Sequence, residues 1–185
     1  MRRQDIPNLI SITRILLVVP LVVALLDYQF GIAMVLFAIA GISDALDGFL
    51  AKHYHWESRL GSILDPLADK LLLVAGFATL TWLGFIPNWL LWLVLGRDIM
   101  IVTGGMAYHY LYGKFKLLPL WSSKINTFFQ IMLVFAVIVQ HYANLEVQYW
   151  IETGVSLVVI SVTISGAEYM IVWGRRAWRL HKNNL

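Results

Sequence analysis

The sequence has 185 residues, of which 59% are hydrophobic and 14% are charged, with a mean hydropathy of +0.72 and a formal net charge of +3. Soluble domains are typically about 45–50% apolar and about 25% charged, so a single core of this size could not bury so much apolar side chain. The composition therefore excludes an ordinary soluble domain, and the lack of cysteine in the sequence excludes disulfides and thiolate metal sites.

Six apolar segments are long enough to span a bilayer, which takes about 20 residues. They cover approximately residues 6–26, 30–52, 61–83, 88–111, 122–141 and 148–173. Gly84 and Pro87 mark a turn after the third segment, and Gly113 and Pro119 mark another after the fourth. We predict an all-α polytopic membrane protein, with six transmembrane helices in one bundle and a single domain over residues 1–185.

The distribution of basic residues predicts the orientation in the membrane. The first apolar run follows Arg2 and Arg3 as in a secretory signal, but no small-residue cleavage site precedes Asp27, so we interpret the run as a retained first helix. With a cytoplasmic N-terminus, the outer loops lie near residues 27–29, 84–88 and 142–147, and none of them contains Lys or Arg. All 14 basic residues then fall toward the inner side, as the positive-inside rule expects. Both termini are predicted to be cytoplasmic.

Four aspartates interrupt the second and third segments. Asp44 and Asp47 are three residues apart, and Asp65 and Asp69 are four residues apart, so each pair lies on one helix face. Only residues 52–60 separate the two segments, so we expect a hairpin that brings the four carboxylates together. Carboxylates inside a spanning segment cost roughly 2.5–3.5 kcal/mol at its centre and usually mark function.

The acidic cluster predicts a metal site. Four carboxylates cannot all stay ionised at low dielectric without cations, and carboxylate oxygens suit hard divalent ions. We expect the four aspartates to hold two Mg²⁺ or Mn²⁺ ions, an arrangement that assists displacement at phosphorus. The small residues Gly48, Ala51 and Gly61 leave room for a ligand beside the ions. The alternative is that the aspartates are solvated charges at helix ends.

Residues 44–69 read Asp-x-x-Asp-Gly-x-x-Ala-Lys, then eight residues, then Gly-x-x-x-Asp-x-x-x-Asp. This pattern resembles the signature of the CDP-alcohol phosphatidyltransferase family, and the resemblance extends from Ile6 on the first segment to Lys124 on the fifth. The sequence has Lys52 where the family has Arg, which keeps the positive charge and loses the planar two-pronged donor.

The resemblance implies the reaction and the roles of individual residues. The donor would be CDP-diacylglycerol and the leaving group CMP. Asp44, Asp47, Asp65 and Asp69 would hold the metal ions, and Asp69 would also be the general base on the acceptor hydroxyl. The residues expected to bind the CDP donor are Asn8, Thr13, Asp47, Gly48, Ala51, Lys52, Gly61 and Ser62. The resemblance also implies a homodimer and an active site that faces the cytoplasm. We expect the membrane to be a bacterial inner membrane, and we expect no nucleic-acid partner.

Two further cations are candidates to hold an anionic acceptor. Arg97 lies inside the fourth segment beside Asp98, and Lys124 lies near the start of the fifth. The alternatives are a structural pair between Arg97 and an acid, Asp98 or one of the cluster, and snorkelling of Lys124 to lipid headgroups. These stretches are similar to the eukaryotic-type cardiolipin synthases of the family, which implies phosphatidylglycerol as the acceptor. Glycerol 3-phosphate is the alternative, because phosphatidylglycerophosphate synthases share much of the framework.

Other classes of protein fit the sequence less well. An ion or proton transporter needs polar groups through both leaflets, and no chain of ionisable residues continues through the predicted outer halves. Intramembrane prenyltransferases also place aspartates over Mg²⁺, but they have longer chains and Asn-Asp-x-x-Asp patterns. A lipid-binding scaffold gives no reason to keep four acids together. The sequence assigns no role to Glu168, deep in the last segment.

Overall fold

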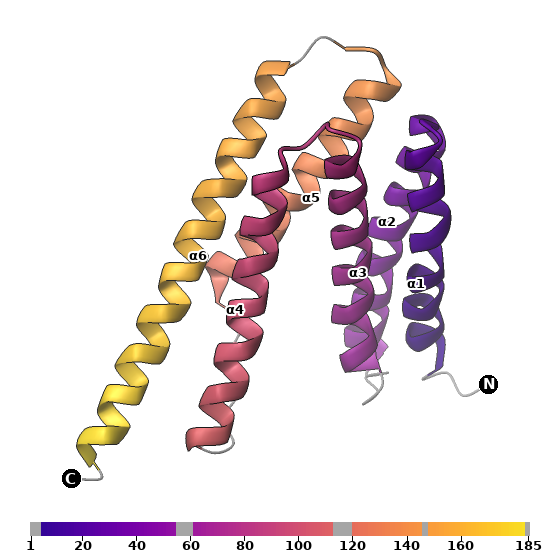
Figure 1. The fold of residues 1–185 in the computed structure, drawn as a ribbon. Coiled ribbons are helices and arrows are strands. Elements are labelled where there is room, and N and C mark those ends of the chain that lie inside the picture. Colours follow the sequence, from indigo (N-terminus) through magenta and orange to yellow (C-terminus); the bar gives the residue numbers. More distant parts are fainter. Residues whose placement is uncertain (1–4, 55–60, 113–119, 146–147, 184–185) are drawn as a thin grey trace. The chain divides into compact units, whose positions relative to one another are not determined.

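Six α-helices make up the described part of the computed structural model, which covers residues 5–54, 61–112, 120–145 and 148–183. In chain order they are α1 (Asp5–Leu26), α2 (Phe30–Tyr54), α3 (Gly61–Trp82), α4 (Asn88–Tyr112), α5 (Trp121–Tyr142) and α6 (Gln148–Asn183) (Figure 1). The predicted all-α class is confirmed. The ends of the first five helices each lie within two residues of the predicted segments.

The last helix is longer than predicted. It runs to Asn183, ten residues past the predicted end at residue 173. The prediction followed the apolar run, which ends near Trp173, whereas the residues that follow include arginine, alanine and leucine, which favour helix without forming an apolar stretch. With 36 residues, α6 is about 54 Å long at a rise of 1.5 Å per residue.

Within the described residues, four helices are long and apolar enough to cross a membrane: α1, α4, α5 and α6. The most apolar window is Leu9–Leu26 on α1, with a mean hydropathy of 2.6. On α2 the described apolar stretch covers Phe30–Asp44, and the side chains from residue 45 onward are only partly described. The crossing of the bilayer by α2 and α3 stays a prediction.

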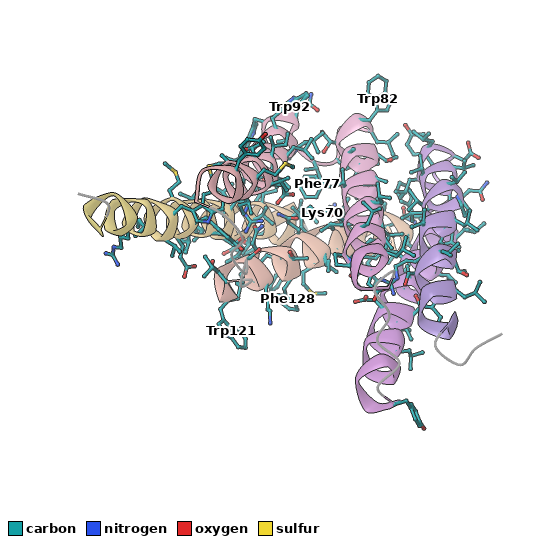
Figure 2. The ribbon with its side chains drawn as sticks, turned by 90° about the horizontal axis from the view of Figure 1, so that it is seen from below. Lys70, Phe77, Trp82, Trp92, Trp121 and Phe128 are labelled. Carbon is teal, nitrogen blue, oxygen red and sulfur yellow. The ribbon has the colours of Figure 1, made fainter. Side chains whose placement is uncertain are left out.

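Large apolar side chains are exposed on the helix surfaces. Leu16, Val19 and Ile160 are more than half exposed. Figure 2 shows Trp82 and Trp121 projecting from the ends of α3 and α5, and these side chains are 84% and 78% exposed. Exposed apolar side chains of this kind suit hydrocarbon, and tryptophan favours the level of the headgroups. The surface therefore fits a protein that lies in a membrane.

One compact unit consists of Met1–Ile86 and Val134–Val147, so it contains α1, α2, α3 and the C-terminal part of α5. In this unit α1 packs against both α2 and α3, and the three helices lie side by side in Figure 1. Leu21, Phe37 and Phe77 are among its buried core residues. Gly76 admits a close neighbour, since a Cβ there would lie 3.6 Å from Cγ1 of Val134. The contacts of α1 with both neighbours hold together the two helices that carry the aspartates.

The second unit consists of Pro87–Leu133 and Gln148–Leu185, which contain α4, the N-terminal part of α5 and α6. Here α4 packs against α6. The helices approach closely at Gly104, where an added Cβ would lie 1.9 Å from Cζ3 of Trp173. The ring of Trp173 also makes an edge contact with Tyr169, with ring centroids 5.5 Å apart. The position of the indole therefore requires glycine at residue 104.

Replacement of Gly104 by alanine is expected to lower the melting temperature by about 5 °C, because overpacking typically costs about 1–3 kcal/mol. Thermal unfolding of the purified protein in detergent would measure it. Gly174→Ala on α6 is the matched control, since a Cβ there meets nothing within 4 Å. The control should leave stability unchanged or raise it, because alanine favours helix over glycine. Equal changes in the two variants would contradict the close packing at Gly104.

Candidate active site

Two aspartates from different helices meet at one guanidinium group in the first unit. Arg14 on α1 donates from Nη1 to Oδ1 of Asp44 on α2 at 2.8 Å, and the same nitrogen donates to Oδ1 of Asp69 on α3. Two acceptors on one nitrogen lie within about 6 Å of each other. The Arg14 side chain is 1% exposed, whereas those of Asp44 and Asp69 are 46% and 44% exposed. The predicted approach of α2 and α3 aspartates is therefore present for this pair.

A third aspartate of the cluster also has a partner on α1. The hydroxyl of Ser11 donates to Oδ1 of Asp65, and Ser11 is fully buried. Ser11 and Arg14 are three residues apart, so they lie on one face of α1. Three of the four predicted carboxylates thus contact donors on a single helix face. The side chain of the fourth, Asp47, lies outside the described residues.

The described carboxylates have the right chemistry for a hard divalent cation, since they offer only oxygen donors and are partly open to solvent. Among the residues whose side chains are described, however, no group of three or more acids or histidines is gathered closely enough to hold a metal ion. Asp47, the fourth predicted ligand, lies beyond that set, and the guanidinium of Arg14 lies between Asp44 and Asp69. The two-metal site stays a prediction.

The predicted donor-binding residues are only partly described. Thr13 is exposed on α1, and its hydroxyl donates to the carbonyl of Leu9 at 2.9 Å. Gly61 is buried at the first residue of α3. The other six predicted donor residues lie outside the part of the chain whose side chains are described. They are Asn8, Asp47, Gly48, Ala51, Lys52 and Ser62. The assignment of all eight to the donor pocket stays a prediction.

The two predicted acceptor residues lie in the second unit. Arg97 on α4 is buried, and its Nη1 donates to Oδ1 of Asp98 at 2.9 Å. Its Nη2 donates to the hydroxyl of Ser123 on α5 at 2.9 Å and to that of Ser165 on α6. The structural pair of Arg97 with Asp98, considered above as an alternative, is therefore present. Arg97 at the same time connects three helices of its unit.

Lys124 is in a different environment from Arg97. It is exposed on α5, and its Nζ lies 4.9 Å from the centroid of the Trp121 ring. A lysine over the face of an indole is attracted by the negative face of the ring. This contact keeps the ammonium group near the start of α5.

A cleft of about 390 Å³ lies between α4 and α6 in the second unit. Arg97 lines it, and the other lining residues are mostly small or apolar, among them Gly96, Met100, Val162, Gly166 and Met170. The Nε of Arg97 has no hydrogen-bond partner among the described residues. The cleft therefore has a mostly apolar lining and one cation, Arg97, whose Nε is available to donate a hydrogen bond.

The sequence profile described as CDP-alcohol phosphatidyltransferase matches residues 4–167. The chain belongs to this family. The match includes the acidic motif and both cations discussed above, and it extends over all six helices, ending inside α6. The family assigned by resemblance is confirmed.

Named members of the CDP-alcohol phosphatidyltransferase family are similar to this chain. A cardiolipin synthase (CMP-forming) of Rattus norvegicus is 37% identical over 147 residues, which cover 71% of this chain and 49% of that protein. One of Streptomyces coelicolor is 36% identical over 108 residues, covering 55% of this chain and 50% of that protein. The chain thus spans about half the length of the cardiolipin synthases that it matches.

A relative named for a different activity matches more of the chain. The chloroplastic CDP-diacylglycerol–glycerol-3-phosphate 3-phosphatidyltransferase 1 of Oryza sativa is 33% identical over 202 residues, which cover 95% of this chain and 60% of that protein. Glycerol 3-phosphate, one of the two acceptors considered from the sequence, therefore occurs in the name of one relative, and cardiolipin, the product expected from the other acceptor, occurs in the names of others.

Sequence reasoning missed the two residues of α1 that contact the aspartates of this family member. Arg14 was counted only among the cations of the cytoplasmic side, and Ser11 was not considered. A signal for Arg14 existed, because it is the one Lys or Arg inside the apolar window Leu9–Leu26, where a charge usually marks function. Ser11 carried no comparable signal, since serine is common in membrane helices.

Proposed function

We propose that this chain is an integral membrane transferase that moves a phosphatidyl group from CDP-diacylglycerol to an alcohol, releasing CMP, and that the alcohol is phosphatidylglycerol, giving cardiolipin. The observation that carries the proposal is the meeting of Asp44 and Asp69 from two helices at Arg14, in a chain of the CDP-alcohol phosphatidyltransferase family. Ionisable side chains within membrane helices are costly and usually mark a functional site, and hydrophobic packing does not explain why these carboxylates lie together.

In the proposed reaction, the hydroxyl oxygen of the acceptor attacks the phosphorus of the phosphatidyl group. The bond from that phosphorus to the CMP oxygen breaks, and CMP leaves. Asp69 accepts the hydroxyl proton as general base, a role that a half-exposed carboxylate can fill. Asp44, Asp47, Asp65 and Asp69 would hold two Mg²⁺ or Mn²⁺ ions, which supply charge neutralisation at the diphosphate.

The donor pocket is proposed at the N-terminal end of α3 and along the facing residues of α1 and α2. Gly61, Gly48 and Ala51 would let the nucleotide approach the helix backbones, with Lys52 beside the diphosphate. Asn8, Thr13 and Ser62 would add hydrogen bonds. The burial of Gly61 supports a close-packed wall at this point.

The cleft between α4 and α6 favours a lipid acceptor over glycerol 3-phosphate. Its mostly apolar lining suits an acyl chain, and Arg97 suits the phosphate of phosphatidylglycerol. The exposed ammonium of Lys124 would be the second cation for the acceptor. Relatives named as cardiolipin synthases (CMP-forming) agree with this choice, whereas the rice relative keeps glycerol 3-phosphate as the alternative.

We also propose that all six helices cross the membrane, with both termini and the active site on the cytoplasmic side of a bacterial inner membrane. The support is the placement of all Lys and Arg away from the three predicted outer loops. The chain would act as one domain and as a homodimer. Protease accessibility from each side of sealed vesicles and chemical cross-linking in the membrane would test these proposals separately.

The acceptor assay tests the function. Purified protein in nanodiscs receives radiolabelled CDP-diacylglycerol with phosphatidylglycerol, glycerol 3-phosphate, serine or inositol phosphate in separate reactions. We expect labelled cardiolipin and CMP with phosphatidylglycerol, and rates at least about tenfold lower with the others, because only a lipid acceptor fills the apolar cleft. Arg97→Gln should raise the KM for phosphatidylglycerol about tenfold or more and leave the KM for the donor unchanged.

The matched control is Arg175→Gln, which neutralises an exposed arginine on α6 and should change neither constant. Labelled phosphatidylglycerophosphate as the main product would replace the proposed acceptor with glycerol 3-phosphate. Release of pyrophosphate in place of CMP would point to a prenyltransferase. Movement of protons or Na⁺ by the protein in liposomes without CDP-lipid would overturn the enzyme proposal in favour of a transporter.

A further inference from the structure

Arg14 is a buried charge within the most apolar helix of the protein. It lies inside the window Leu9–Leu26 of α1, and its side chain is 1% exposed. A charge in such a place is tolerated only when it is paired and hydrogen-bonded. Its partners include Asp44, 30 positions along the chain, and Asp69, 55 positions along, so these two pairs exist only in the folded bundle.

The geometry of the pairing differs from that of an ordinary ion pair. One nitrogen, Nη1, contacts both carboxylates, so the guanidinium lies between α2 and α3 at the level of the cluster. Arginine stays protonated at any accessible pH, so this positive charge is permanent. Without it, two carboxylates within about 6 Å would repel each other across a medium of low dielectric. Arg14 therefore does for Asp44 and Asp69 what a bound cation would do.

We infer that Arg14 is a positioning residue, a built-in counter-cation that holds Asp44 and Asp69 together in the absence of divalent ions. This inference rests on the proposed function, which assigns Asp44 and Asp69 to the active site. It follows that the bundle α1–α3 assembles without metal, and that the ions arrive at carboxylates that are already in place. Ser11 contributes in a different way, because its hydroxyl orients Asp65 without adding charge.

The test compares thermal stability with and without metal for the full-length protein in detergent. For the unaltered protein, we expect the melting temperature in EDTA and in millimolar Mn²⁺ to differ by only a few degrees. For Arg14→Gln, we expect a fall of about 10 °C in EDTA and recovery of most of the loss in Mn²⁺, because the removal of one partner leaves the two carboxylates in repulsion until an ion replaces it. Mn²⁺ affinity, measured by electron paramagnetic resonance, should rise about tenfold in this variant, since a fixed positive charge is removed.

Three further variants separate charge from packing. Arg14→Lys keeps the charge and should depend on Mn²⁺ less than Arg14→Gln does. Ser11→Ala, on the same face of α1, should lower the melting temperature equally in EDTA and in Mn²⁺. The double variant Arg14→Gln/Asp44→Asn removes the repulsion and should recover stability in EDTA. If Arg14→Gln can be purified only with Mn²⁺ present throughout, that dependence itself supports the inference.

An equal fall of the Arg14→Gln melting temperature in EDTA and in Mn²⁺, with unchanged Mn²⁺ affinity, would overturn the inference and leave Arg14 as a packing residue. These readouts do not use turnover. Failure of the unaltered protein to transfer a phosphatidyl group would show in the acceptor assay and not here, so the two failures are distinguishable.

Discussion

Replacement of Asp69 by asparagine is expected to lower the rate of phosphatidyl transfer by about a thousandfold, within the range of about 10²–10⁴ that general-base catalysis contributes. The amide has the same shape as the carboxylate and keeps an oxygen that can accept from Arg14, so the fold should persist. It cannot take up the proton of the acceptor hydroxyl. CMP release under saturating substrate would measure the loss without the effect that removal of one proposed metal ligand has on donor binding.

The control for this variant is Asp27→Asn, which neutralises an exposed aspartate in the turn after α1 and should leave the rate unchanged. The other cluster positions should behave differently from Asp69. In Asp44→Asn and Asp65→Asn, donor binding and the response to metal should weaken together, because these carboxylates are proposed as ligands only. Near-normal turnover in Asp69→Asn would remove Asp69 as the base.

Removal of divalent ions is expected to abolish activity, with recovery when Mg²⁺ or Mn²⁺ is added back. The proposed role of the ions is to neutralise the diphosphate of the donor, and Arg14 does not take over this role because its guanidinium pairs with Asp44 and Asp69. The measurement is CMP release after dialysis against EDTA, followed by titration of each ion. Ca²⁺ is a useful comparison, since it accepts oxygen ligands but prefers a larger and looser coordination shell.

One result would contradict the predicted requirement for divalent ions. A protein that transfers phosphatidyl groups at full rate after dialysis would show that the aspartates act without divalent ions. Asp44→Asn should need more metal for half-maximal activity than the unaltered protein, which links the requirement to the cluster. The same titration on Asp27→Asn should match the unaltered protein.

The sequence predicted the helices well because hydrophobic periodicity and length depend on local composition. The five helices whose ends follow apolar runs came out within two residues of prediction. The end of α6 could not be found in that way, because the residues after Trp173 are mostly polar and still helical. The spacing of the aspartates also predicted that each pair lies on one face of α2 or α3. The contact of Asp44 and Asp69 with Arg14 could not be predicted in this way, because it depends on how α1 packs against both helices.

The two hydroxyl residues Ser11 and Thr13 on α1 show why the contacts of a side chain cannot be predicted from its amino-acid type alone. Ser11 and Thr13 are two positions apart, which separates them by about 200° around a helix with 3.6 residues per turn. One faces the aspartates and contacts Asp65, and the other is exposed and bonds within its own helix. Thr13 was assigned to the donor pocket from family resemblance, and nothing in the amino-acid type distinguishes the two. Only the orientation of α1 in the bundle does.

The length of α6 has a consequence for bilayers of different thickness. A hydrocarbon core of about 30 Å takes about 20 residues of helix, so a helix of 36 residues continues about 24 Å beyond it. Tyr149 and Trp150, both exposed in the first turn, favour one headgroup layer and would fix that end. In a thicker membrane, more of the C-terminal part of α6 would lie in the bilayer and less of it would extend into water. The N-terminal end would keep its depth, and the basic C-terminal end would extend a shorter distance from the membrane surface.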